Sequence, residues 1–293
     1  MAEVTTLDGA WLRANPLPLP DEESDKNARG RVFVVGGCMT VPGGVRLTAE
    51  AALRSGAGKV RIATVEPTAV ILGAFLPEVA VLPQPMDEAG EIDAAVARIA
   101  DDVRRCDALV IGPAMGCKRQ ASALVGMALA EEARAGLVLD AAALMALSDH
   151  ALALCRRERP AVLTPHIGEI AALLGRDAGE IDKDRVAATR DCAERFGSVV
   201  VLKGAVSIVA EPGGATFSYS GGNVGLATGG SGDVMAGIAA ALIARGAEPT
   251  VAALWAVWLH GEAGRRCAET VGPLGFLASE LLGFIPQVMQ RAA

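Results

Sequence analysis

Short apolar segments alternate with helical segments along nearly the whole chain, and this alternation limits the possible folds more than any other feature. The strand-like segments are rich in Val, Ile and Leu and cover residues 31–35, 59–65, 108–111, 137–139, 161–163 and 199–202. Helical patterns lie between them at 45–55, 121–134, 167–174 and 185–196. This order predicts an α/β domain in which helices cover both faces of a mostly parallel central sheet.

The pattern changes after the last of these strands. Two β-like runs within residues 207–220 flank the turn Glu211-Pro212-Gly213-Gly214, which predicts a hairpin at the edge of the sheet. Residues 233–245, 250–267 and 276–290 are predicted to be helical. The acids and prolines of residues 1–30 favour a leading arm or an edge segment, so we expect a single domain over 31–293.

Composition excludes several classes of protein. The formal net charge of −7 argues against a nucleic-acid surface, which needs clustered Lys and Arg. The chain starts without the basic and apolar segments of a signal peptide, and no apolar run of about 18 residues predicts a membrane span. The six scattered cysteines form no C-x-x-C pair, which indicates reduced thiols and a cytoplasmic protein.

The glycine-rich stretch over residues 225–237 has the character of a phosphoryl-transfer site. Gly230, Ser231 and Gly232 precede an apolar helix, so their backbone amides and the helix dipole would attract an anion. A carboxylate there repels phosphate, which suggests that Asp233 is a general base for an attacking hydroxyl. The alternative is an aspartate N-cap after a flexible loop.

Several other polar residues follow predicted strands, where open α/β sheets bind ligands. Lys203 can meet a nucleotide phosphate or simply reach solvent. Asp140 can orient a hydroxyl or hold a water on Mg²⁺, or it can cap the next helix. In the motif Thr164-Pro165-His166-Ile167-Gly168-Glu169, Thr164 is a plausible helix cap, and His166 with Glu169 is an improbable metal pair.

Two weaker signals lie elsewhere in the chain. The turn Gly112-Pro113-Ala114-Met115-Gly116 could bring backbone close to a ligand, although turn geometry alone would also explain its glycines. His260 lies in the apolar helical segment ALWAVWLHGEAG, and we expect it to be packed rather than catalytic.

The order of these motifs resembles the ADP/ATP-dependent NAD(P)H-hydrate dehydratase family. The resemblance runs from about Arg31 to the C-terminus through VVGG, ALVIGPAMG, VLDAAAL, LTPHIGE, VVLKGA, GLATGGSGDVMAG and WLHGEAG. It implies a single three-layer α/β/α domain of the ribokinase-like superfamily. It also implies repair of the S epimers of hydrated NADH and NADPH, called NADHX and NADPHX, through phosphorylation of the hydrate by ADP or ATP and loss of phosphate.

The resemblance assigns roles to residues of this chain. Asp233 is the implied base, and Gly230, Ser231 and Gly232 form the implied anion hole. The run Lys203, Gly204, Ala205, Val206 and Ser207, with Gly232, is implied to bind the nucleotide. Gly44, Gly116, His166, Asp140 and Asp233 are implied to face the hydrated dinucleotide. Mg²⁺ is expected with the nucleotide, and no protein side chain is assigned as a metal ligand.

Three motifs on the implied substrate side differ from the usual family sequences. Val41-Pro42-Gly43-Gly44 stands where Tyr-Pro-Gly-Ala is usual, and GPAMG stands where GPGLG is usual. The usual DADAL is Asp140-Ala141-Ala142-Ala143-Leu144, which keeps the first acid and lacks the second. The nucleotide and base motifs match.

Two other functions stay open from the sequence. One is a kinase of the same fold that phosphorylates an alcohol such as a hydroxymethyl-pyrimidine or thiazole, and the other is a non-catalytic nucleotide sensor. The sequence also leaves open whether ADP or ATP is the donor. The family implies a homo-oligomer, with tetramers known, and a separate hydrate epimerase, because about thirty residues before the first strand cannot form that domain.

Overall fold

The computed structural model describes residues 3–19, 25–130 and 135–292, and their strands form one sheet. The strand order is β1-β10-β9-β8-β7-β6-β5-β2-β3-β4, and the run from β8 to β4 is entirely parallel. This sheet confirms the predicted fold class. The strands are β1 (Thr5–Thr6), β2 (Arg31–Val35), β3 (Lys59–Val65), β4 (Ala80–Gln84), β5 (Ala108–Ile111), β6 (Gly136–Leu139), β7 (Val162–Leu163), β8 (Val199–Leu202), β9 (Ser207–Ala210) and β10 (Thr216–Tyr219).

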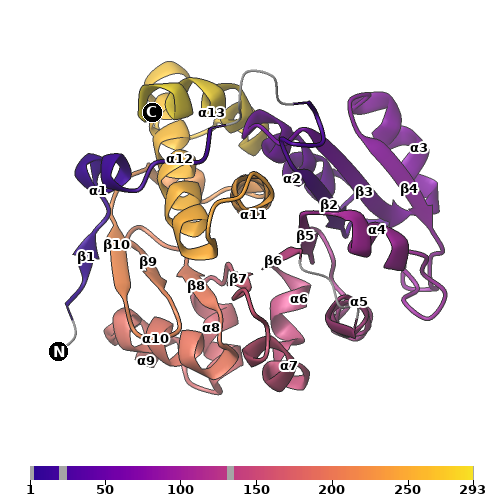
Figure 1. Cartoon of the computed structure of the whole chain (residues 1–293), viewed down its shortest axis with the longest axis horizontal. Helices are drawn as coiled ribbons and strands as arrows, with labels where there is room; N and C mark the ends of the chain where they lie inside the picture. The colour runs from indigo at the N-terminus through magenta and orange to yellow at the C-terminus, as the bar shows by residue number, and fades with distance from the viewer. Residues whose placement is uncertain (1–2, 20–24, 131–134, 293) are drawn as a thin grey trace.

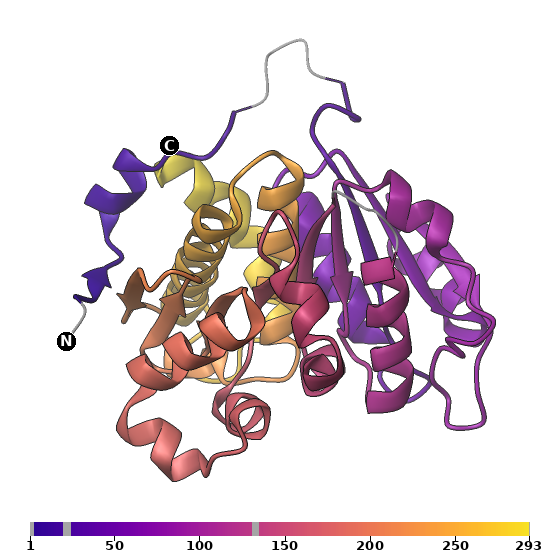
Figure 2. The ribbon, with the colours of Figure 1, turned by 60° about the horizontal axis from the view of Figure 1, so that its bottom comes forward.

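Helices form a layer on each side of this sheet, as Figures 1 and 2 show. One buried cluster includes Val32 and Val34 of β2, and the other includes Phe33 and Val35, so alternate side chains of one strand enter opposite layers. No helix in the described ranges is both long enough and apolar enough to cross a bilayer. The α-helices are α1 (Gly9–Ala14), α2 (Gly43–Arg54), α3 (Glu66–Phe75), α4 (Ala100–Arg105), α5 (Lys118–Ala130), α6 (Ala142–Met145), α7 (Ala151–Cys155), α8 (Ile167–Leu174), α9 (Ala178–Lys183), α10 (Arg185–Phe196), α11 (Ser231–Ala244), α12 (Pro249–Thr270) and α13 (Ala278–Ala292), with short 3₁₀ turns η1 (Leu147–Asp149) and η2 (Val224–Leu226).

The predicted strands and helices are present, with shifts at their ends. The strand expected at 161–163 is reduced to Val162 and Leu163, and the helix expected at 45–55 begins two residues earlier. The helix expected at 121–134 begins at Lys118, and its last four residues lie outside the described ranges. Edge strand β4 was not predicted, because it is only partly buried and contains Pro83, which weakens the strand pattern.

The N-terminal segment changes the predicted edge of the sheet. β9 and β10 form the expected antiparallel hairpin, but β1 pairs with β10 in parallel and takes the edge position. The indole of Trp11 in α1 packs edge-on against Phe217 of β10, with ring centroids 5.8 Å apart. Residues 5–14 therefore extend the sheet and its helical layer.

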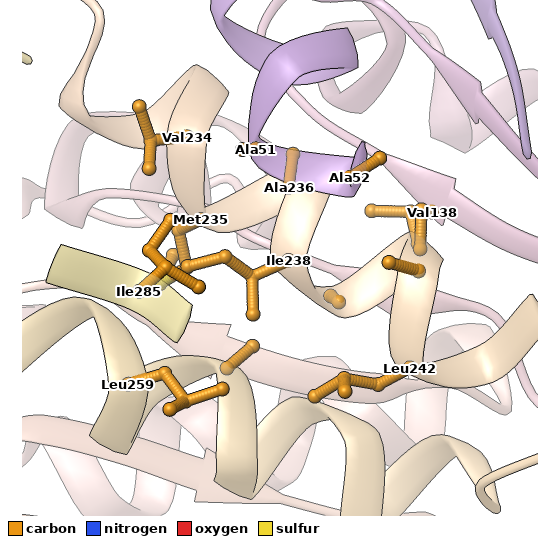
Figure 3. Close-up of a cluster of buried hydrophobic side chains, with 14 of the residues drawn as sticks. Ala51, Ala52, Val138, Val234, Met235, Ala236, Ile238, Leu242, Leu259 and Ile285 are labelled. Carbon is orange, nitrogen blue, oxygen red and sulfur yellow. The ribbon is translucent and has the colours of Figure 1, made fainter. Parts of the chain in front are cut away.

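Helix α11 is the element on which the site is built, and it is buried on most of its surface. Val234, Met235 and Ile238 of α11 lie among side chains of α2, α12 and α13 (Figure 3). A Cβ added to Gly237 would lie 2.1 Å from the carbonyl oxygen of Thr48 in α2, so only glycine permits this approach of the two helices. Close packing on several sides fixes where α11 begins.

Candidate active site

The polar residues predicted to form a site follow neighbouring strands. Asp140 follows β6, Thr164 follows β7 and Lys203 follows β8, and these three strands are adjacent and parallel. The carboxyl ends of parallel strands share one edge of the sheet. Side chains far apart in the sequence therefore meet there.

Asp140 and Lys203 form an ion pair at this edge. Lys203 Nζ lies 3.0 Å from Asp140 Oδ1, and Thr164 Oγ1 donates a hydrogen bond of 2.7 Å to the same oxygen. Asp140 therefore does not cap the next helix, whose N-cap is Ala141. Although burial lowers the pKa of Lys203, the nearby carboxylates of Asp140 and Glu169 raise it overall. The ammonium stays charged and is available to an anion.

The first turn of α11 lies beside this ion pair. Gly230 is the N-cap, with a φ of 88° that favours glycine, and no side chain caps the helix. Asp233 is therefore in the first turn and is not the N-cap. Helix capping by this side chain does not explain its position. A Cβ added to Gly232 would lie 3.2 Å from Lys203 Nζ. The free amides of a helix N-terminus and the Lys203 ammonium thus lie next to each other.

The carboxyl group of Asp233 has the electrostatics of a general base. Burial and, to a lesser extent, the negative charge of Asp140 raise its pKa to about 7, against the opposing positive charge of Lys203. A base with a pKa near neutrality can accept a proton, and it is still deprotonated in a large fraction of the protein molecules at neutral pH. The environment therefore supports the role predicted from the sequence.

Ser231 has a partner that the sequence did not reveal. Ser231 Oγ and His260 Nε2 of α12 share a hydrogen bond of 2.8 Å. Burial lowers the pKa of His260 to about 4, so the imidazole is neutral at physiological pH. His260 is packed, as predicted, and it also orients the hydroxyl at the start of α11.

His166 has a structural role in addition to any contact with substrate. It is the N-cap of α8, where its Nδ1 accepts hydrogen bonds from the amides of Gly168 and Glu169, and Glu169 completes a capping box. The prediction that Thr164 caps this helix is therefore wrong. The side chain of His166 is 59% exposed, and its Nε2 lies 3.7 Å from Glu169 Oε2.

The predicted nucleotide segment is the loop between β8 and β9. Residues 204–206 are exposed, and the guanidinium of Arg185 in α10 donates to the carbonyl oxygens of Lys203 at 3.1 Å and Val206 at 3.2 Å. A Cβ on Gly204 would lie 2.4 Å from this guanidinium. Arg185 thus fixes the conformation of this loop. It was not predicted, because a lone arginine at a helix start has no distinctive sequence signal.

The substrate-side glycines differ in their relation to Asp233. A Cβ on Gly44 would lie 2.9 Å from Asp233 Oδ2, so the start of α2 borders the base directly. Gly116 is instead tied to Glu91, which accepts hydrogen bonds from the amides of Gly116 and Cys117 at 2.7 and 3.1 Å. Glu91 was also missed, because it lies in a loop between short irregular segments.

The described residues contain no group of three or more His, Cys, Asp or Glu side chains arranged to hold a metal ion. A hollow of 610 Å³ lined by Lys118, Arg119, Ser122 and His150 lies at α5 and contains none of the predicted site residues. The carboxyl edge of the sheet is therefore where the predicted chemistry concentrates.

Comparison with known proteins gives a consistent result. The NAD(P)H-hydrate dehydratase family model matches residues 32–287. An ADP-dependent (S)-NAD(P)H-hydrate dehydratase from Xanthomonas campestris is 43% identical over 98% of this chain and 97% of its own length. A bifunctional NAD(P)H-hydrate repair enzyme from Moorella thermoacetica is 36% identical, and the match spans 97% of this chain but 54% of that protein.

A solved structure agrees with the sequence matches. The ADP/ATP-dependent NAD(P)H-hydrate dehydratase from Bacillus subtilis, co-crystallised with ATP and Mg²⁺, superposes with a TM-score of 0.83 at 28% identity, and the match covers 100% of both chains. The shared fold, the order of motifs and the family match lead to one assignment. This chain belongs to the NAD(P)H-hydrate dehydratase family.

Proposed function

We propose that this protein dehydrates the S epimers of NADHX and NADPHX to NADH and NADPH, with ADP as the phosphoryl donor. The observation that carries the proposal is the position of Asp233, whose carboxyl group has a pKa of about 7 and lies at the start of α11 beside Lys203. The ADP-dependent name of the Xanthomonas campestris relative supports the choice of donor.

Each site residue has its own role in the proposed reaction. Asp233 takes the proton of the hydrate hydroxyl, whose oxygen attacks the terminal phosphorus of ADP and releases AMP. The first-turn amides at Ser231 and Gly232, with Lys203, stabilise the charge on the transferred phosphoryl group. Loss of phosphate from the phosphorylated hydrate, together with a proton from the adjacent ring carbon, then forms the double bond of the reduced nicotinamide ring.

The two ligands would approach from different loops. The loop containing Gly204, Ala205 and Val206, together with Ser207, holds the nucleotide, and Arg185 keeps that loop in place. Gly44, Gly116 and His166 face the hydrated dinucleotide. Asp140 contributes by holding Lys203 and by adding negative charge near Asp233.

Mg²⁺ fits this site as a companion of the nucleotide. It prefers oxygen ligands and usually takes several from phosphates and water, so a protein cage is not required. The carboxylates of Asp140 and Glu169, which lie near Lys203, would hold its hydration shell. When bound, the ion would neutralise charge on the phosphates.

The assembly and setting of the enzyme are also proposed. Val70 and Phe75 of α3 are 81% and 67% exposed, and such apolar side chains support a homo-oligomer, for example a tetramer. All six cysteines are free, which supports a cytoplasmic location. A hydrate epimerase would convert the R epimer to the S epimer, and the bifunctional Moorella relative supports this link.

The test is to incubate the protein with enzymatically hydrated NADH, Mg²⁺ and either ADP or ATP, and to follow the return of reduced-nicotinamide absorbance. Recovery with ADP that disappears in Asp233→Asn is expected. Nucleotide consumption only with added hydroxymethyl-pyrimidine or thiazole alcohols would instead identify a kinase. Nucleotide binding by thermal shift without any turnover would identify a sensor.

A further inference from the structure

The start of α2 and the turn containing Ala114 come together beside the carboxylate of Asp233, where there is room for only one methyl group. A Cβ added to Gly44, at the start of α2, would lie 2.6 Å from the Cβ of Ala114 and 2.9 Å from Asp233 Oδ2. Carbon atoms packed without strain stay about 3.5–4.0 Å apart. An alanine at 44 therefore cannot coexist with both Ala114 and Asp233 in their present positions.

Ala114 itself has an unusual backbone conformation. Its φ is 54°, and Ala141 is the other non-glycine residue with a positive φ among the described residues. This conformation costs an L-residue roughly 1–2 kcal/mol, and glycine adopts it freely. Backbone strain of this kind tends to persist where the surrounding structure or function requires it. The Ala114 methyl group lies against Gly44, and the space at Gly44 separates this methyl group from Asp233 Oδ2.

We propose that Ala114 is a positioning residue for Asp233, and that positions 44 and 114 act as a unit that supplies one methyl group to the wall of the site. The proposal rests on the proposed function, because it takes Asp233 as the base. In this protein Ala114 supplies the methyl group and Gly44 leaves space for it. The reciprocal pair, alanine at 44 and glycine at 114, would fill nearly the same space.

A double-mutant cycle tests this coupling. Gly44→Ala pushes its new methyl group against the base, so we expect kcat/KM for NADHX to fall at least about tenfold, with an altered pH profile. Ala114→Gly removes the methyl group but relieves the strained backbone, so we expect a smaller loss, about two- to fivefold. The double variant Gly44→Ala/Ala114→Gly should return to within about threefold of the original protein, with its original pH profile.

Gly283→Ala is the matched control. Gly283 is exposed in α13, outside the predicted site, and a Cβ there meets no atom within 4 Å. This variant therefore adds a methyl group elsewhere on a helix, and it should leave activity unchanged without lowering the melting temperature. The proposal is overturned if the double variant is as impaired as Gly44→Ala, or if Gly44→Ala alone behaves like the original protein.

Melting temperatures separate this proposal from the proposed function. If the protein does not dehydrate NADHX, the proposed function fails. The steric unit still predicts that Gly44→Ala melts at a lower temperature and that adding Ala114→Gly restores it. The protein could also be active while the double variant regains stability but not turnover. In that case the pair would be only a packing contact, and its positioning role would be overturned.

Discussion

Glu91 holds Gly116 by a hydrogen bond of 2.7 Å from the Gly116 amide to its Oε1 oxygen. The two residues are 25 positions apart, and Glu91 is only 5% exposed. The same oxygen accepts from Cys117, while Oε2 has no hydrogen-bond partner within the described residues. One buried carboxylate thus fixes the backbone of the turn that we propose faces the hydrated dinucleotide.

Glu91→Ala should therefore weaken substrate binding. The amides of Gly116 and Cys117 would lose their acceptor, at a cost of about 1–3 kcal/mol, and the turn would lose its fixed position. We expect a higher KM for NADHX with the KM for ADP unchanged, and partial rescue by Glu91→Gln, which keeps an acceptor oxygen. Gln84→Ala is the control, because Gln84 Oε1 accepts from Arg98 in the same region but away from this turn. Equal changes in both KM values would contradict the assignment.

The pH dependence of turnover should report Asp233. The base must be deprotonated to accept the hydroxyl proton, so kcat/KM should rise with pH and level off above the pKa of about 7. A profile measured from about pH 5 to pH 9 should lose this rise in Asp233→Asn, together with nearly all activity. A flat profile for the original protein would show that another group is the base.

Asp233→Asn should also make the protein more stable at alkaline pH. The folded-state pKa of Asp233 is raised from 3.8 to about 7, so the folded protein binds more protons than the unfolded chain between these values. Stability from this group therefore falls as pH rises through that window. The melting temperature of the variant should exceed that of the original protein at about pH 8, and the difference should shrink toward pH 4.

Lys203 and Asp140 should move the pH profile in opposite directions. The charge of Lys203 lowers the pKa of Asp233 and that of Asp140 raises it. Lys203→Met should shift the rise in kcat/KM to higher pH and weaken nucleotide binding, whereas Asp140→Asn should shift it to lower pH. Shifts in the same direction would mean that the ion pair acts mainly through structure.

His260→Ala should reduce turnover by leaving Ser231 without its 2.8 Å partner at the start of α11. We expect a loss in kcat of about tenfold, since a mispositioned anion-hole donor commonly costs this much or more. His150→Ala is a matched control, because His150 bonds Ser122 at 3.0 Å in α5, apart from the site. If both variants lose activity equally, the effect of His260 is one of general stability.

His260 also predicts a pH effect on stability. Burial lowers its pKa from 6.5 to about 4, so the unfolded chain binds more protons than the folded protein between these values. Stability from this group is therefore present above about pH 6.5 and declines as pH falls toward 4. Replacement by glutamine should flatten the acid side of a plot of melting temperature against pH.

The fold and the main site residues could be predicted because their signals are local. Apolar strands ending in Asp140 and Lys203, and a glycine loop before Asp233, place side chains at one edge of any parallel sheet. Glu91 and Arg185 could not be found this way. Their roles depend on contacts with backbone atoms 25 and 18 residues away, and such contacts leave no periodic pattern in the sequence.

The differences at positions 44 and 114 illustrate another limit of the sequence. Considered separately, Gly44 has lost a methyl group relative to the usual motif and Ala114 has gained one. The structure brings both positions to the same place, where a Cβ on residue 44 and the Cβ of residue 114 would be 2.6 Å apart. Two separate substitutions in the sequence are thus one relocated methyl group in space.

This geometry also restricts the order in which the two residues can change over evolution. An ancestor with alanine at 44 and glycine at 114 would lose activity and stability if it gained Ala114 first, because the intermediate would bring two methyl carbons to 2.6 Å, closer than van der Waals contact. The passable intermediate has glycine at both positions and leaves the space empty. Lineages that moved this methyl group from one position to the other would therefore have lost it before they regained it.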